Sequence, residues 1–186
     1  MAAPGTSGAR FDALIADLEA ALAEIAALTE GEQARWKRGR PGKWNAGQHT
    51  DHVVTVMEHT AADFVAAEPA LRDGSLAPPA PRGGLERLWV STLFRGWMPR
   101  GGRTVKRAEP EGYPDRAQVL ERGRQAIERH RELGARLTPD ERDRLWIANM
   151  FMPKWRYTLP EMVRVHAVHV RHHAKQIAEA MGARTR

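Results

Sequence analysis

The sequence contains no cysteine. This absence excludes disulfide bridges, zinc sites built on thiolates, iron–sulfur clusters and a cysteine nucleophile. Long apolar runs are also missing, because none approaches the roughly 18 to 20 residues that a membrane-spanning helix needs. The opening residues, MAAPGTSGAR, lack the apolar core of a secretory signal. We therefore expect a cytoplasmic protein whose chemistry comes from side chains other than cysteine.

The remaining composition is that of an ordinary globular chain. Of the 186 residues, 42% are hydrophobic and 28% are charged, which excludes a wholly disordered or collagen-like protein. The length suits one domain with a substantial core. A formal net charge of +6 permits binding to acidic partners but does not require it.

Apolar residues recur at steps of three and four, which predicts an all-α protein. We expect four main helices, and their approximate bounds are 9–30, 45–68, 115–136 and 159–181. Asn45 is a suitable N-cap for the second, which should end before Pro69. Residues 1–8 are predicted to be a disordered N-terminus, and residues 9–182 to form a single domain.

The connections between these helices differ in length. A short helix at about 85–97 is expected within a long crossover between the second and third main helices. The segment 139–158 is expected to begin with a short turn at Pro139 and then to cross over through an aromatic-rich stretch. No alternating pattern indicates a β-strand. The predicted fold is a four-helix bundle with a long, decorated crossover.

Four of the eight histidines lie between residues 166 and 173. On a helix, His166, His169 and His173 fall on one stripe. The His169/His173 pair, four residues apart, places two imidazoles side by side, as in helical zinc sites. A third ligand would come from the second helix, which offers three histidines: His49, His52 and His59. Three imidazoles would leave coordination positions open for water or substrate, which is typical of a catalytic metal site.

Two motifs carry a resemblance to a known family. Trp44-Asn45-Ala46-Gly47-Gln48-His49-Thr50-Asp51-His52 has a histidine eight positions after a tryptophan, and His169-Val170-Arg171-His172-His173-Ala174-Lys175-Gln176-Ile177 holds a second histidine group. Together they resemble the opening of the second helix and the last helix of the DinB superfamily, over residues 10–181. The resemblance implies a bundle with up-down-down-up helix directions. It also implies a divalent metal (zinc, nickel or iron) held by His52, His169 and His173. The first alternative ligand is His166, which shares the stripe one turn earlier, and the next is His49.

The same resemblance implies a class of activity. Characterised DinB-like proteins include metal-dependent transferases that act with low-molecular-weight thiols and a thiol-dependent maleylpyruvate isomerase. We therefore expect a metal-dependent transferase or hydrolase with a small-molecule substrate and, because cysteine is absent, an exogenous thiol if one is used. The family also makes a homodimer the expected assembly. Glu58 and Gln176 are candidates to orient a ligand or carry a proton. Four arginines are candidates to hold an anionic cosubstrate: Arg38, Arg40, Arg100 and Arg103.

Two other functions remain open from the residues. Lys37-Arg38-Gly39-Arg40-Pro41 contains the Arg-Gly-Arg-Pro core of peptides that bind the minor groove of A·T-rich DNA, so a basic DNA-binding protein is one alternative. The plain interpretation of this segment is a turn that leads into the second helix. The other alternative is a non-catalytic helical protein whose role is interaction with a partner.

Overall fold

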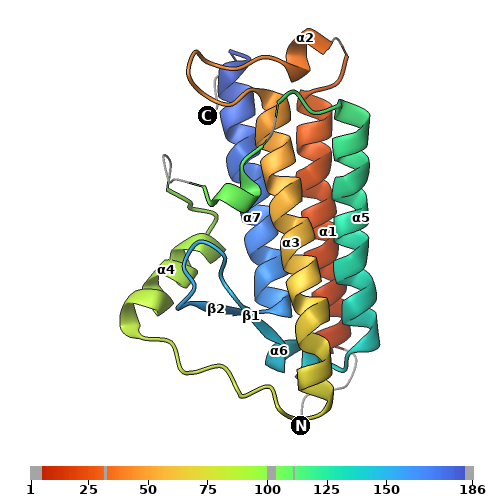
Figure 1. Ribbon diagram of the computed structural model, residues 1–186, viewed down its shortest axis with the longest axis vertical. Helices are drawn as coiled ribbons and strands as arrows, with labels where there is room; N and C mark the ends of the chain where they lie inside the picture. Colours follow the sequence, from red (N-terminus) through yellow and green to blue (C-terminus); the bar gives the residue numbers. More distant parts are fainter. Residues whose placement is uncertain (1–5, 32, 100–103, 111, 183–186) are drawn as a thin grey trace.

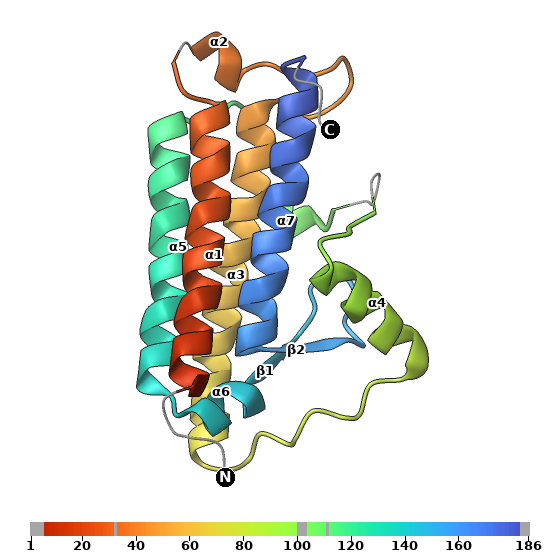
Figure 2. The ribbon, with the colours of Figure 1, turned by 180° about the vertical axis from the view of Figure 1, so that it is seen from behind.

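The computed structural model describes residues 6–31, 33–99, 104–110 and 112–182. Four long helices form a bundle (Figure 1): α1 (Thr6–Leu28), α3 (Ala46–Arg72), α5 (Arg116–Arg136) and α7 (Leu159–Ala180). α1 and α3 each pack against both α5 and α7, so α1 and α3 lie diagonally across the bundle. α1 and α7 run in one direction and α3 and α5 in the other, as seen from both sides (Figure 2). The predicted all-α, up-down-down-up bundle is confirmed.

The helix starts follow from local capping. The Asn45 side chain accepts a hydrogen bond from the Gln48 N–H, and the Gln48 side chain accepts one from the Asn45 N–H, which forms a capping box for α3. Thr158 and Glu161 form the equivalent box at α7. α1 begins at Thr6, so residues 6–8 are helical where we expected disorder, and residues 1–5 lie outside the described part of the chain. Among the described helices, none has the length and apolar character needed to cross a membrane.

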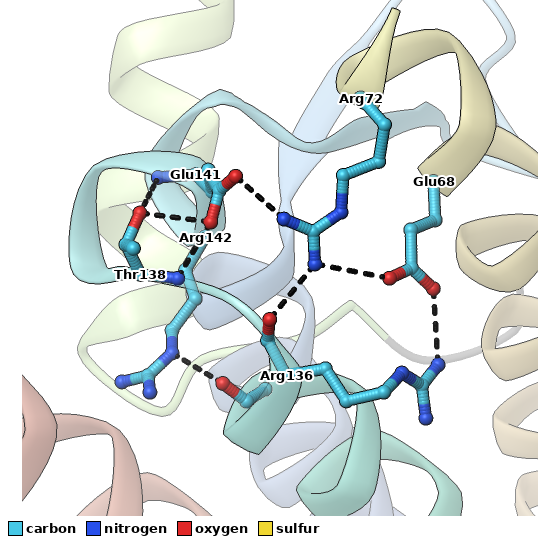
Figure 3. A network of polar contacts seen from close by, with 7 residues as sticks. Glu68, Arg72, Arg136, Thr138, Glu141 and Arg142 are labelled. Carbon is cyan, nitrogen blue, oxygen red and sulfur yellow. Dashed lines mark hydrogen bonds and ion pairs between the residues drawn. The ribbon is translucent and has the colours of Figure 1, made fainter.

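α3 does not end before Pro69, as the sequence predicted, but continues to Arg72. Proline inside a helix removes one backbone hydrogen bond, and here the last turn is held by other contacts. The Arg72 guanidinium donates to the Glu141 carboxylate (2.8 Å), the Arg136 carbonyl (2.8 Å) and the Glu68 carboxylate (3.4 Å), as Figure 3 shows. This network anchors the end of α3 to the turn between α5 and the short helix α6 (Pro139–Arg144), which a local sequence rule cannot anticipate.

The long crossover between α3 and α5 runs beside the bundle rather than across its end (Figure 1). It contains α4 (Gly84–Phe94) and a short 3₁₀ helix, η1 (Lys106–Ala108). Arg82 fastens it to the bundle through two hydrogen bonds to the Glu161 carboxylate (both 2.6 Å). Arg164 of α7 donates to the Phe94 carbonyl at the end of α4 (2.8 Å). Arg82 and Arg164 thus attach the part of the crossover that contains α4 to α7.

Four small elements complete the fold: the helices α2 and α6 and two strands. The sequence predicted a short turn at Pro139, where α6 begins, but it predicted neither α2 nor the strands. α2 (Gln33–Trp36) covers one end of the bundle, where buried Trp36 donates from Nε1 to the Pro114 carbonyl (2.6 Å). At the other end, α6 (Pro139–Arg144) leads into an antiparallel pair of strands, β1 (Trp146–Ala148) and β2 (Arg156–Thr158). β1 contacts α3 and β2 contacts α7, so the hairpin lies over the edge between these two helices.

Candidate metal centre

Three buried histidines from two helices converge between α3 and α7. His52 lies on α3, and His169 and His173 lie one turn apart on α7. Each offers one ring nitrogen, and these nitrogens all lie within 4.8 Å of one another. The Nε2 atoms of His169 and His173 are 3.1 Å apart. This arrangement, the three-histidine cluster, brings together the residues that the sequence and the family resemblance singled out.

The orientation of His52 is fixed by the crossover. Its Nδ1 lies 2.7 Å from the Ala108 carbonyl oxygen at the end of η1. A carbonyl can only accept, so Nδ1 carries the proton and donates it, and Nε2 keeps its lone pair. The backbone of the crossover thus selects the tautomer that a metal ligand needs.

His49 lies behind the cluster, where it contacts His173. The Nδ1 atoms of the two rings are 2.8 Å apart, so one donates to the other. Because Nε2 of His173 faces His169, the Nδ1 atom of His173 is the one available to donate to His49. Trp44 packs against these rings, with its centroid 4.9 Å from that of His52 and 5.6 Å from that of His49. His49 therefore supports a member of the cluster.

Burial keeps the cluster neutral. It lowers the pKa of His169 and His173 well below the usual histidine value, and the neighbouring histidines lower it further. Burial also lowers the pKa of His52, although its hydrogen bond to Ala108 acts in the opposite direction. The pKa of His49 falls to about 4 for the same main reason. Neutral imidazoles at pH 7 have the free lone pairs that a metal ion requires.

The donor set fits a divalent transition metal. Zinc binds imidazole nitrogens at about 2.0 to 2.1 Å, and tetrahedral geometry then places two ligand nitrogens about 3.3 Å apart. The 3.1 Å between the Nε2 atoms of His169 and His173 is close to that value. The cluster contains no carboxylate, so its ligands suit zinc, nickel or iron better than magnesium or calcium.

The cluster opens into a cavity of about 740 Å³, a typical size for a small-molecule site. Side chains from the bundle, the crossover and the hairpin loop line it. On the bundle side are Trp44, His49, Thr60, His166 and Gln176. On the outer side are residues of α4, of the segment after it and of the 149–155 loop. This access distinguishes the cluster from a closed structural metal site.

The alternative ligands have other partners. His166 lines the cavity, but its Nε2 is 2.7 Å from the Thr60 hydroxyl and its ring packs edge-on against His130. His49 bonds to His173, as described above. Neither residue is in the three-histidine cluster.

The two candidate supporting residues have different positions. Gln176 lines the cavity, as its spacing from His173 suggested. Glu58 instead forms two hydrogen bonds with Arg122 of α5, at 2.6 and 3.1 Å, and is absent from the cavity lining. Glu58 lies six positions after His52, and this step along the helix turns it toward α5, where its described hydrogen bonds are to Arg122.

Of the two candidate arginines that the structure describes, Arg40 lines the cavity. It lies at the rim beside Lys43, 3.7 Å from the Glu179 carboxylate. Arg38 is not in the lining, and its carbonyl accepts the Ala46 N–H at 2.9 Å. Arg100 and Arg103 lie outside the described residues.

Sequence reasoning missed three features of the site. The Ala108 carbonyl is a backbone group with no sequence signal. The contact between His49 and His173 joins residues 124 positions apart. Trp44, which was singled out in the sequence only as part of the first motif, also lines the cavity. Its position within the first motif was the available signal.

The sequence and the fold were compared with those of known proteins. The model of the DinB superfamily matches residues 10–177. The chain belongs to the DinB superfamily. A comparison with curated proteins finds no match. Among solved structures, the chain is similar to YfiT from Bacillus subtilis, which is described as a probable metal-dependent hydrolase with an unusual four-helix bundle topology. The TM-score is 0.58 at 18% identity, over 93% of this chain and 88% of YfiT. That likeness shows the shared DinB fold.

Proposed function

We propose that the protein is a metal-dependent enzyme in which His52, His169 and His173 hold one divalent ion of zinc, nickel or iron. The observation that carries this proposal is the convergence of three buried, neutral imidazoles on an open cavity. A metal held in this way lowers the pKa of a bound water or thiol and so supplies a nucleophile at neutral pH. The reaction class is transfer of a group from a small molecule to that nucleophile.

The chain's own residues prepare the site for this chemistry. Ala108 holds the proton of His52 on Nδ1, and His49 does the same for His173, so both present Nε2 to the cavity side. Trp44 shields the rings from solvent on one side. The cationic rim residues Arg40 and Lys43 favour the approach of an anionic group.

Two nucleophiles are compatible with the proposal. Water would make the enzyme a hydrolase, and the fold shared with YfiT is consistent with that choice. A thiol would make it a transferase, and it would have to be exogenous because the chain has no cysteine. Assays with an electrophile or ester, with and without glutathione or bacillithiol, distinguish the two by whether turnover requires the thiol.

The metal site itself is tested by metal content. Tag-free protein, reconstituted with zinc and desalted, is compared by mass spectrometry with His52→Ala, His169→Ala and His173→Ala. We expect about one metal per chain in the parent and loss in each variant. His59→Ala is the matched control. His59 also lies on α3, but its described hydrogen bond is to the Arg107 carbonyl and not to a member of the cluster. Full retention of metal in the three variants would overturn the ligand set.

A further inference from the structure

The outer side of the cavity is built almost entirely of apolar side chains. This outer wall consists of Trp89, Leu93, Met98, Phe151, Met152 and Trp155. Trp89 packs on Trp155 with ring centroids 5.7 Å apart, a favourable aromatic separation. Among the described lining residues, none of those in the outer wall is ionisable. Trp89 and Leu93 come from α4, and the last three come from the hairpin loop.

The hairpin loop has an ordered shape that presents Phe151 to the cavity. The Asn149 side chain accepts the N–H groups of both Phe151 and Met152 at 2.8 Å. The Trp155 N–H closes the turn on the Met152 carbonyl, also at 2.8 Å. Phe151 remains 39% exposed and Met152 40% exposed. Large apolar side chains held in a fixed turn and still exposed indicate a binding surface.

Phe151 also lies against the three-histidine cluster. Its ring centroid is 6.4 Å from that of His52 and 6.5 Å from that of His169. The ionised lining residues lie elsewhere, at the rim: Arg40 and Lys43 precede α3, and Glu179 lies in the last turn of α7. The cavity therefore has an apolar side and a charged rim, with the cluster exposed to both.

We propose that the outer wall binds an aromatic or other apolar group of the substrate while the reacting atom lies at the three-histidine cluster. The inference deepens the proposed function and rests on it. An apolar group that enters this space removes its own surface and that of Phe151 and Met152 from water. The wall would thus select substrates with a bulky apolar group over small polar ones.

Two hydroxamates test the inference, because they share one metal-binding group and differ in what is attached to it. Benzohydroxamate carries a phenyl ring, and acetohydroxamate carries a methyl group. Their dissociation constants are measured by calorimetry on the tag-free, zinc-loaded protein. We expect benzohydroxamate to bind at least about tenfold more tightly, because burying extra apolar carbons in a fitted pocket gives discrimination of that order.

Two variants test whether the outer wall causes the preference for benzohydroxamate over acetohydroxamate. Phe151→Ala removes a partly exposed loop side chain, and Trp155→Ala removes a second wall residue. We expect both to reduce the preference toward unity by weakening benzohydroxamate binding more than acetohydroxamate binding, with zinc content measured alongside. Tyr113→Ala is the control, because it deletes an aromatic ring that is 75% exposed and outside the cavity lining. It should keep the parent's preference.

The possible results distinguish a failure of the outer-wall inference from a failure of the proposed metal site. Equal affinities for the two hydroxamates in a zinc-loaded parent protein would overturn the inference and leave the metal centre standing. A preference that survives in both wall variants would also overturn it. Failure of the parent protein to bind zinc, or of zinc-loaded protein to bind either hydroxamate, would overturn the open metal site and the inference with it.

Discussion

Buried His130 should make the protein sensitive to acid. The ring is fully buried in the bundle, where Nδ1 donates to the Ala126 carbonyl (2.8 Å) and Nε2 has no hydrogen-bond partner among the described residues. Burial lowers its pKa from 6.5 to about 4. At about 1.4 kcal/mol per pKa unit, this difference corresponds to about 3 kcal/mol.

The direction in which pH changes the free energy of unfolding follows from proton binding. Between about pH 6.5 and 4 the unfolded chain binds a proton at His130 and the folded protein does not. The free energy of unfolding therefore falls as the pH falls through that window, and the stability is fully present above pH 6.5. His130→Leu removes this contribution. At pH 7 the change should be small, because it removes an unpaired buried nitrogen as well as one hydrogen bond to a helical carbonyl.

The assay is urea denaturation of metal-free protein at half-unit steps from pH 7.5 to 4.5. The difference in unfolding free energy between His130→Leu and the parent should grow toward low pH, approaching a slope of about 1.4 kcal/mol per pH unit. His59→Leu, which deletes a partly exposed histidine on α3, is the matched control. Parallel curves for the parent and His130→Leu would refute the reasoning, because they would show that His130 takes up its proton equally in both states.

Three further outcomes are expected. Gly47→Ala should lower the free energy of unfolding by about 1 to 3 kcal/mol in urea, because the new Cβ would lie 2.7 Å from the Trp36 ring. Arg82→Lys should speed hydrogen exchange in residues 146–158, since a lysine cannot donate two parallel hydrogen bonds to Glu161. In fluorescence anisotropy with an A·T-rich duplex, the protein should show no tight, salt-sensitive binding that depends on Arg38, because the segment is a turn pinned to the start of α3.

The bundle could be predicted from the sequence because amphipathic helices leave a periodic signal. The third and fourth main helices were placed within about one residue of α5 and α7. The end of α3 was not, because Arg72 contacts groups on α5 and α6 that are distant in sequence. Local rules treat Pro69 as a stop, and tertiary contacts overrode it.

The candidate site was predictable where spacing determines geometry. Residues four apart on a helix must lie on one face, so His169 and His173 could be paired from the sequence. His52 needed the resemblance to the DinB superfamily, since spacing alone left His49 and His59 on the same helix open as the third ligand. Glu58 is close to His52 in sequence but does not face it. A step of six positions along a helix points its side chain toward Arg122 instead.

Only part of the outer wall had a sequence signal. Trp89 and Leu93 lie four residues apart on α4, within the short helix predicted at about 85–97. Met98 and the residues of the 149–155 loop follow no helical or strand period, and β1 and β2 have only three residues each, too few for an alternating pattern. Only folding places these residues on one side of a cavity. Substrate selectivity is thus the part of the account that depends most on the tertiary structure.

The most direct test of the metal centre is a crystal structure of the tag-free protein with stoichiometric zinc, with anomalous data collected at the zinc edge. We expect one strong anomalous peak within bonding distance of Nε2 of His52, His169 and His173, with at least one coordination position facing the cavity. A peak that lies elsewhere, or one coordinated by His49 or His166 in place of one of these three, would contradict it.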